Sequence, residues 1–237
     1  MDNILIKSID RQSGTSDNFV IYSNLIIEGT YIVKSCSIPN TIYNVNNTNN
    51  QFVLLEGLGS IPVTLPVGNY NHSTFANMLE VTLTSAGLLT YSAVIDPITY
   101  VMTVTNTTDS FCAFDFTQIK SFAQQLMGFE RDYTGANTSI VSDGIVVLGS
   151  PESIGIQIEQ STSRNYENIS TDSVGTIYVP LNKAFGSYVT IPSIDLPQYV
   201  KFERRERHLR IRIVDTSRNI PLSLNSANYE LLLSRCN

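Results

Sequence analysis

Residues 208–215 read His-Leu-Arg-Ile-Arg-Ile-Val-Asp, an alternation of apolar and cationic side chains. Successive side chains of a β-strand point to opposite faces, so this spacing predicts a strand that is half buried. The members expected in the core are Leu209, Ile211 and Ile213, and those expected on the outer face are His208, Arg210 and Arg212. We expect the apolar members to be needed for folding. Replacing Arg210 and Arg212 by glutamine should leave the fold nearly intact, as surface changes usually do.

The same alternation recurs at residues 154–159, where three isoleucines are expected to point inward and Glu159 outward. Further short strand-like runs, such as 18–23 and 29–38, are separated by Pro, Gly, Asn and Ser. Thr, Ile and Val are plentiful, and Lys, Glu and Ala are scarce, which favours strands over helices. The chain is therefore predicted to be mainly β, an antiparallel sandwich or barrel.

One stretch departs from this pattern. Apolar residues from Phe75 to Leu83 recur at helical spacing, Asn71 or Ser73 can cap the helix, and Gly87 can end it. A second short helix is expected at about 117–126, whereas the Asn-rich tract 44–50 is expected to be a loop. We predict a small α+β insertion at residues 60–130, within a sandwich formed by residues 1–59 and 131–237.

The composition limits the classes of function. The chain has 237 residues, of which 42% are hydrophobic and 15% charged, enough apolar material for a sizeable core. Its apolar runs are far shorter than the roughly 20 residues of a membrane span. The N-terminus has neither a basic start nor a small-residue cleavage site, so the chain is expected to remain inside the cell that makes it.

The sequence offers little catalytic chemistry. Three cysteines form no C-x-x-C pair, only two histidines are present, and no metal or other cofactor is predicted. The phosphate-binding, dinucleotide-binding and nucleophile-elbow motifs are absent. A carboxylate pair drawn from distant strands stays open as an alternative. We therefore expect a protein that is not an enzyme, with no catalytic residues.

The positive charge is concentrated late in the chain. Seven of the fifteen Lys and Arg residues fall within residues 201–218, which carry a net charge of +4, so the remainder carries −10. Three interpretations fit: a solvated strand face, a subunit interface whose arginines clamp carboxylates, and a nucleic-acid surface. Overall acidity argues against the last. The candidate interface residues are Arg204, Arg205, Arg207, His208, Arg210 and Arg212.

Several stretches occur in a shared order along nearly the whole chain. They are residues 11–19 (RQSGTSDNF), 28–43 (EGTYIVKSCSIPNTIY), the Asn-rich loop, 65–70 (LPVGNY) with its helix, 127–129 (MGF), and the basic strand before 225–232 (NSANYELL). In this order the sequence resembles the penton proteins of virophages and polinton-like viruses. These are minor capsid proteins of icosahedral double-stranded DNA viruses.

This resemblance implies a single jelly roll of two packed four-stranded sheets, standing upright in the capsid with both chain ends at its base. It also implies a homopentamer at each five-fold vertex, surrounded by a double-jelly-roll major capsid protein, with minor cement proteins as further partners. The expected location is the virion. Residues 11–16 are expected to form an arm that orders only on contact. The alternative function is a jelly-roll binding module, either a viral receptor-binding head or a lectin.

Overall fold

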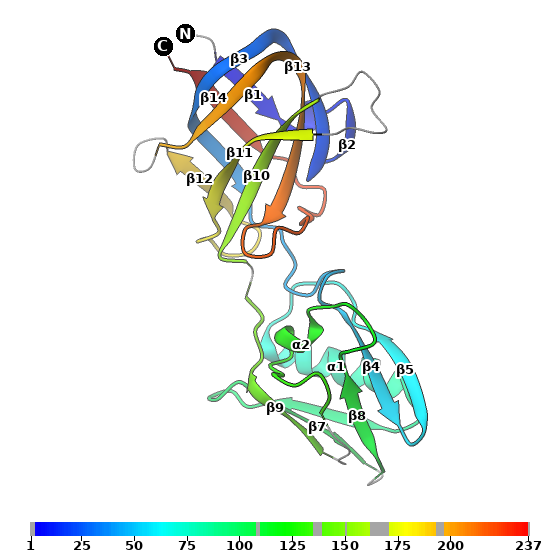
Figure 1. Ribbon diagram of the computed structural model, residues 1–237. Helices are drawn as coiled ribbons and strands as arrows, with labels where there is room; N and C mark the ends of the chain where they lie inside the picture. The colour runs from blue at the N-terminus through cyan, green and yellow to red at the C-terminus, as the bar shows by residue number, and fades with distance from the viewer. Residues whose placement is uncertain are drawn as a thin grey trace. The chain divides into compact units, whose positions relative to one another are not determined.

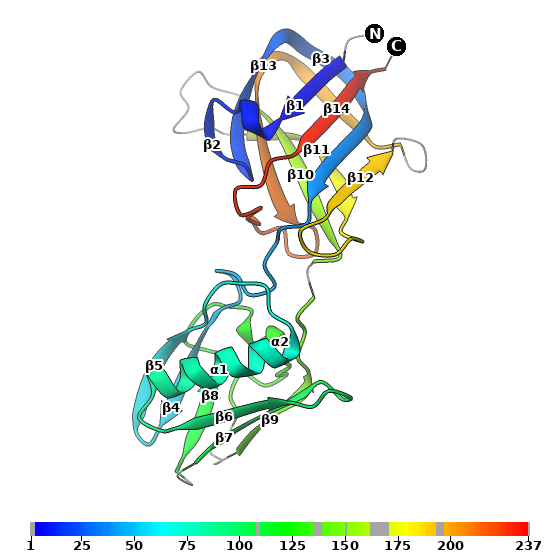
Figure 2. The same cartoon turned by 180° about the vertical axis from the view of Figure 1, so that it is seen from behind.

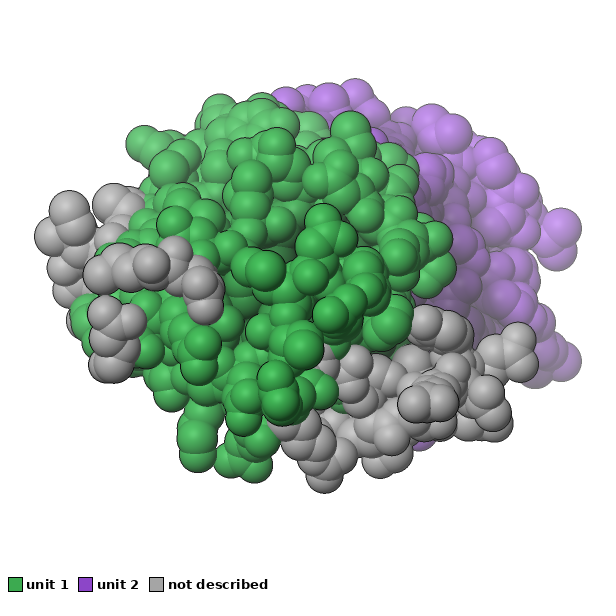
Figure 3. Space-filling model, turned by 90° about the horizontal axis from the view of Figure 1, so that it is seen from above, with its two compact units in different colours: residues 1–42, 151–237 green, residues 43–150 purple. Residues whose placement is uncertain are grey.

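The computed structural model describes residues 3–107, 110–134, 139–149, 151–161, 171–192 and 197–236. The chain forms two compact units, shown as ribbons in Figures 1 and 2 and in separate colours in Figure 3. Unit 1 consists of residues 1–42 and 151–237, and unit 2 of residues 43–150. Unit 2 is thus inserted between the two segments of unit 1, and it is wider than the 60–130 insertion expected from the sequence.

Strand pairing explains the wider boundaries. Strand β4 (Gln51–Glu56) pairs with β5 (Gly59–Thr64) and β8 (Cys112–Asp115), so it belongs to the sheet of the inserted unit. Strand β9 (Ser139–Ile145) pairs with β7 (Val101–Asn106), so it also belongs to the inserted unit. The division expected from the sequence places both β4 and β9 in the sandwich.

Unit 1 is built from strands, all of them paired antiparallel. Hydrogen bonds join eight described strands in one sheet with the order β1-β14-β3-β13-β10-β11, and β2 and β12 also pair with β3. The bounds are β1 (Asn3–Lys7), β2 (Ser13–Thr15), β3 (Asn18–Pro39), β10 (Ser153–Ser161), β11 (Thr171–Pro180), β12 (Tyr188–Pro192), β13 (Tyr199–Asp215) and β14 (Glu230–Arg235). Figure 1 shows the sheet curling around its core. The mainly β, antiparallel prediction is confirmed, whereas two separate four-stranded sheets are not distinguished by the hydrogen bonding.

The continuity of the sheet comes from its two longest strands. β3 runs without a break where the sequence suggested two strands, because Gly29, at φ +93°, accommodates a bend in its middle. Side chains of odd number are buried in its first part, as at Phe19 and Tyr31, and side chains of even number at its end, as at Cys36 and Ile38. A β-bulge against β14 produces this change of face. Such bends let one strand follow a curled sheet.

The core of unit 1 contains the residues predicted from alternation. Leu209, Ile211 and Ile213 of β13 are fully buried, as are the three isoleucines of β10, Ile154, Ile156 and Ile158. The two strands pair through Ile156↔Ile213 and Ile158↔Ile211. Each buried Ile contributes roughly 1.5–3 kcal/mol relative to exposure, so these six positions are a large part of what stabilises the unit.

The expectation of an unstructured arm at residues 11–16 is wrong. Strand β2 forms a hairpin with the start of β3, and the Gln12 N–H donates to the Val20 carbonyl at 2.9 Å. Gly14 has φ +93°, and a Cβ there would collide with the Asn18 carbonyl. The glycine that suggested flexibility therefore allows a tight turn with its own backbone partners.

Both crossings from unit 1 into unit 2 are held by one loop of unit 1, residues 181–187. Asn40 donates its backbone N–H to the Ser187 carbonyl and its side-chain amide to the Lys183 carbonyl. The Leu181 N–H donates to the Glu152 carbonyl from the returning segment. The two chain ends lie together elsewhere in unit 1, because β1 pairs with β14. Near the C-terminus Arg235 pairs with Tyr31 of β3, and Tyr31 precedes Pro39 at the crossing by eight residues, or about 26 Å of strand.

Unit 2 combines two three-stranded sheets, β5-β4-β8 and β6-β7-β9, with two helices. The remaining elements are α1 (His72–Ala86), β6 (Tyr91–Ile95) and α2 (Ala123–Leu126), and unit 1 adds a short 3-10 helix, η1 (Ser8–Asp10). Helix α1 packs against β5 and β6, and Figure 2 shows the helix in front of these strands. The predicted cap is confirmed, since Asn71 and Thr74 form a capping box and Gly87 follows the helix. The predicted second helix is shorter than expected.

The Asn-rich tract is a loop, as predicted, but it is not a solvated one. Asn44, Asn49 and Asn50 are at most 8% exposed. Their side-chain amides donate to the Tyr70, Asn44 and Leu65 carbonyls at 2.7–2.9 Å. These bonds satisfy backbone groups that the irregular segment would otherwise leave buried and unpaired. The asparagines therefore help to fix the fold of unit 2.

A buried carboxylate joins the end of β4 to the end of α1. Glu56 is 7% exposed and accepts hydrogen bonds from the Leu88 N–H and the Tyr91 hydroxyl, both at 2.7 Å. Gly87 passes so close that a Cβ there would overlap the Glu56 carboxylate. The absence of a side chain at Gly87 therefore allows the carboxylate to reach the loop after the helix. Burial, together with the hydrogen bond to Glu56, raises the pKa of Tyr91 well above its ordinary value.

Candidate subunit interface on strand β13

Strand β13 changes face in its middle. Val200 and Phe202 point inward near its start, and Leu209 and Ile211 point inward later. Even-numbered residues are thus buried first and odd-numbered residues afterwards. Two register shifts against β3, between Phe202 and His208, produce this change. The bulged stretch contains Arg204, Arg205 and Arg207, which is why these arginines do not continue the row formed by the later ones.

Arg210 and Arg212 gather around one carboxylate. Glu159 of β10 lies directly opposite Arg210 in the sheet. Its Oε1 is 3.0 Å from Arg212 Nη2, and its Oε2 is 4.0 Å from Arg210 Nε. Arg212 Nη2 also donates to Gln157 Oε1 at 2.9 Å, and Arg210 Nε donates to Asn18 Oδ1 at 3.1 Å. The predicted pairing of these arginines with a carboxylate is therefore found within the subunit.

This cluster is incompletely paired. The Glu159 side chain is 5% exposed, whereas those of Arg210 and Arg212 are 32% and 33% exposed. Glu159 Oε2 and Arg212 Nε are buried without a hydrogen-bond partner among the described residues. One negative and two positive charges leave a net charge of +1 at the surface. The guanidiniums can therefore contact a further acceptor while they neutralise Glu159.

The other candidate residues lie apart from this cluster. Arg207 Nη1 donates to the Tyr22 hydroxyl at 2.7 Å, and its guanidinium lies 6.0 Å from the centre of that ring. The His208 ring packs against the same tyrosine, with centroids 5.1 Å apart. Arg205 pairs with Glu28 at 3.3 Å, and both side chains are at least half exposed. The side chain of Arg204 lies outside the described residues.

Sequence reasoning missed the acidic and aromatic members of this surface. Glu159 and Gln157 come from β10, Asn18 and Tyr22 from β3, so they are far from β13 in the sequence. Alternation predicted correctly that Glu159 faces away from the core, but not that it would be buried between arginines. Only the strand register, Glu159↔Arg210 and Tyr22↔His208, brings them together.

Comparison with solved structures gives a match to a viral penton. Among solved structures, the mavirus penton protein matches over 100% of both chains, with a TM-score of 0.45 and 11% sequence identity. No protein-family model matches the chain, and no curated protein sequence matches it.

The charges divide unequally between the two units. Unit 2 contains eight Asp and Glu residues but only two basic residues, Lys120 and Arg131, for a net charge of −6. Unit 1 contains 13 acidic and 13 basic residues and is neutral. The +4 carried by residues 201–218 is therefore balanced by −4 elsewhere in the same unit. The acidity of the whole chain resides in unit 2.

The remaining surface of the described residues offers aromatic side chains and no metal-binding cluster. Within the described ranges, no group of three or more His, Cys, Asp or Glu side chains could hold a metal ion. No helix in the described part of the chain is long and apolar enough to cross a membrane. Three tyrosines of unit 1, Tyr178, Tyr188 and Tyr199, are each 57–58% exposed. Such partly apolar, partly polar side chains are enriched at protein interfaces.

Proposed function

We propose that this chain is a structural capsid protein, a penton, that assembles as a homopentamer and closes the five-fold vertices of an icosahedral double-stranded DNA virus. Unit 1 is a single upright jelly roll and unit 2 its inserted domain. The partners are four further copies of the chain, the surrounding double-jelly-roll major capsid protein and minor cement proteins. The chain resides at the vertex of the virion, and its role is structural rather than enzymatic.

The observation that carries this proposal is that the insertion leaves unit 1 at a place separate from the two chain ends. The first and last strands, β1 and β14, pair with each other, so both chain ends emerge together. Both crossings to unit 2 are bound by residues 181–187, away from the paired ends along β3. The penton resemblance implies that the chain ends lie at the base of a jelly roll, and some pentons carry an inserted domain that faces outward. Separate positions for the chain ends and the crossings within unit 1 are compatible with both features.

The strand order supports a jelly roll with two opposed layers. β1, β14 and the second part of β3 follow one another at one end of the order, and β13, β10 and β11 at the other. The side chains of both groups enter a common core that includes Ile6, Leu231, Ile156 and Leu209. In a sandwich of this kind, the bent strands β3 and β13 pass from one layer to the other.

The surface chemistry of unit 1 supports a ring. In a cyclic pentamer one surface of each subunit meets a different surface of its neighbour. The arginines of β13, Arg207 beside Tyr22 and Arg210 with Arg212 beside Glu159, supply basic surfaces. Exposed tyrosines on other strands, such as Tyr178 and Tyr188, supply a different kind of surface. Guanidiniums pair favourably with both carboxylates and aromatic rings. A neutral unit 1 also brings five copies together without net repulsion.

Native mass spectrometry of the purified chain tests the proposal. Five copies of 26.3 kDa give a complex of about 132 kDa. We expect this pentamer to weaken in molar salt, because exposed charge pairs are screened. A trimer would instead indicate a receptor-binding head, and a monomer that binds glycans would indicate a lectin. The exposed tyrosines favour such a binding module as the second candidate, because sugars stack on aromatic rings.

The role of the basic surface is tested separately. Arg205 and Arg207 are exposed and do not hold the buried Glu159, so changing both to glutamine should preserve the fold. We expect this variant to assemble less well. A matched variant with Lys34→Gln and Lys183→Gln removes the same charge elsewhere on unit 1 and should assemble normally. Equal assembly of both variants would remove β13 from the interface.

A further inference from the structure

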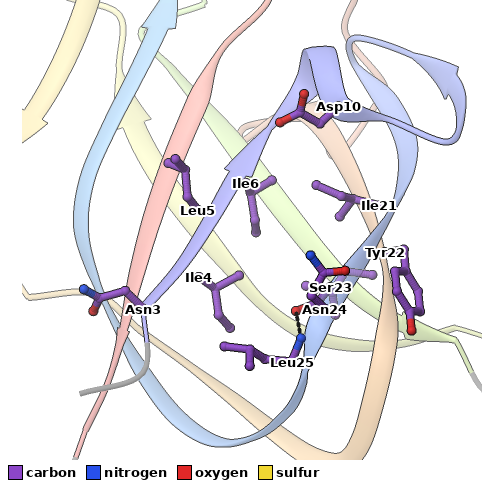
Figure 4. A pocket seen from close by; sticks show the side chains of 11 residues that line it. Asn3, Ile4, Leu5, Ile6, Asp10, Ile21, Tyr22, Ser23, Asn24 and Leu25 are labelled. Carbon is purple, nitrogen blue, oxygen red and sulfur yellow. Dashed lines mark hydrogen bonds between the residues drawn. The ribbon is translucent and has the colours of Figure 1, made fainter.

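A groove opens between β1 and the first part of β3. It has a volume of about 350 Å³, far more than the roughly 30 Å³ of one water. Figure 4 shows Ile4, Ile6 and Ile21 pointing into the gap, with Asp10 at one end and Leu25 at the other. Ile21 and Ile4, at 9% and 7%, are the two most exposed members of the core of unit 1. The groove is therefore a place where the sheet covers its core incompletely.

Both walls of the groove are strand edges. The Val20 carbonyl accepts a hydrogen bond from Gln12 of the hairpin. Alternate residues of a strand direct their backbone groups to the same side, so the N–H and C=O of Tyr22 point the same way, where β2 has ended. No described strand pairs with this edge beyond Val20, because the β2 register covers only Asn18–Val20.

The opposite wall follows the same logic. The Ser8 N–H donates to the Tyr229 carbonyl, so Ser8 directs its backbone groups toward β14. Backbone groups of successive strand residues point to opposite sides. Leu5 and Lys7, at odd numbers of residues from Ser8, therefore direct their N–H and C=O groups away from β14 and toward the groove. Within the described residues β14 is the only partner of β1. Two rows of backbone donors and acceptors thus face a space with an apolar floor.

The rim of the groove indicates what it would accept. Leu5 and Leu25 are 50% and 52% exposed, a large apolar area for a surface position. Asp10 is the one charged residue in the lining, and no ion pair to it is found in the described part of the chain. Its neighbour Arg11 is directed elsewhere, to the Ser8 carbonyl at 2.8 Å. The lining thus combines apolar side chains, the polar side chains of Asn3, Ser23 and Asn24, and one exposed negative charge.

The outer edge of β11 shows how this protein closes such a position. Gln198 uses its side-chain amide to bind the backbone of Tyr178, accepting from its N–H at 2.7 Å and donating to its carbonyl at 2.9 Å. One side chain here takes the place of a neighbouring strand. No side chain among the groove-lining residues does the same for Leu5 or Tyr22, although exposed strand edges invite pairing with other chains.

We propose that the groove between β1 and residues 21–25 is a strand-addition site for an extended segment of another protein. That segment has alternating apolar side chains, which complete the core above Ile4 and Ile21, and a basic residue that reaches Asp10. Backbone pairing supplies most of the affinity, and the apolar side chains supply the register. This inference does not rest on the pentamer, because it concerns a surface that one copy of the chain contains whole.

Synthetic peptides test the site directly. The probe is a fluorescent ten-residue peptide of alternating valine and threonine with a lysine at each end. The comparison peptide has glutamate at both ends, and a third peptide has its alternate backbone nitrogens methylated. We expect only the lysine peptide to bind tightly and to slow hydrogen exchange at the amides of Leu5 and Tyr22. Equal binding of the methylated peptide, or protection elsewhere in the chain, would overturn strand addition.

Variants of the chain locate the contacts. Asp10→Asn should weaken binding of the lysine peptide about two- to five-fold, the usual effect of an exposed ion pair. Leu25→Ser should weaken it about ten-fold through lost apolar burial. Leu88→Ser, at a leucine of unit 2 that is 94% exposed, is the control and should have no effect. If the same amides became protected at high protein concentration without peptide, a second copy would be the occupant and the proposal would be wrong.

Discussion

The two units of this chain enclose their hydrophobic cores with different kinds of secondary structure and carry different net charges. Unit 1 encloses its core mainly with strands, carries no net charge, and holds Arg210 and Arg212 around a buried carboxylate. Unit 2 packs helix α1 against small sheets, has a cluster of phenylalanines in its core, and carries a net charge of −6. For the proposed ring, this difference means that subunit contacts and hydration can be assigned to separate units of the chain. A neutral unit can be packed tightly in a ring while an acidic one stays hydrated.

The first prediction concerns the independence of the two cores. Ile211→Ala should destabilise unit 1 by about 2–5 kcal/mol and Phe114→Ala should destabilise unit 2 by about 3–5 kcal/mol, because each leaves a cavity at a fully buried position. Calorimetry should resolve two unfolding transitions, of which each variant lowers only one. Leu58→Ala, at a fully exposed leucine, is the control. A single transition that both variants lower equally would show that the units unfold together.

The second prediction replaces the sequence-based expectation that glutamine is harmless on β13. Arg212→Gln should cost about 3–5 kcal/mol, because it leaves the buried Glu159 carboxylate poorly compensated. Glu159→Gln in the same chain should recover much of that loss by removing the charge. Chemical denaturation of the single and double variants measures both effects. If the single variant were as stable as the parent chain, the Glu159 cluster would have no role in stability.

The third prediction concerns the corresponding buried carboxylate of unit 2. Gly87→Ala should destabilise this unit by about 1–3 kcal/mol, because its Cβ would displace Glu56 from the Leu88 N–H and the Tyr91 hydroxyl. Gly149→Ala is the matched control, since a Cβ there meets nothing within 4 Å. Thermal unfolding of both variants is the measurement. Equal melting temperatures would mean that the loop after α1 yields without cost.

The smallest expected effect is a loss of stability of unit 2 at acidic pH. A hydrogen bond from Arg131 lowers the pKa of Asp143, and the Thr99 and Ile98 N–H groups lower that of Asp96. A carboxyl with a lowered pKa stabilises the fold above its usual value of about 3.8, and this contribution disappears as the pH falls through the lowered value. The melting temperature of unit 2 should therefore fall below about pH 4. Asp143→Asn should make this fall shallower; an unchanged profile would contradict the assignment.

Local patterns in the sequence predicted what local chemistry determines. The alternation at residues 208–215 identified three buried positions, and the cap at Asn71 identified the start of α1. The insertion boundaries were too narrow because they depend on which strands pair, and β4 pairs with β8 some sixty residues away. Residues 44–50 were correctly expected to form a loop, but composition does not reveal that the amides of Asn49 and Asn50 satisfy buried carbonyls.

The candidate interface shows the same division. The row of Arg210 and Arg212 follows from strand periodicity, and the structure places it as expected, opposite the core. The change of face before His208 could not be predicted, because a β-bulge is visible only in the register with β3. It is this bulge that separates Arg205 and Arg207 from the later arginines and divides one basic run of sequence into distinct surfaces.

Gln198 has an evolutionary consequence. Its amide closes the edge of β11 with two hydrogen bonds, so a single codon change would reopen that edge. One substitution at this position would therefore leave an open strand edge, which another chain could pair with and which could also promote aggregation. A substitution at Gln198 would therefore reduce protection against aggregation and also create an edge for binding another chain, while the core of unit 1 stays unchanged.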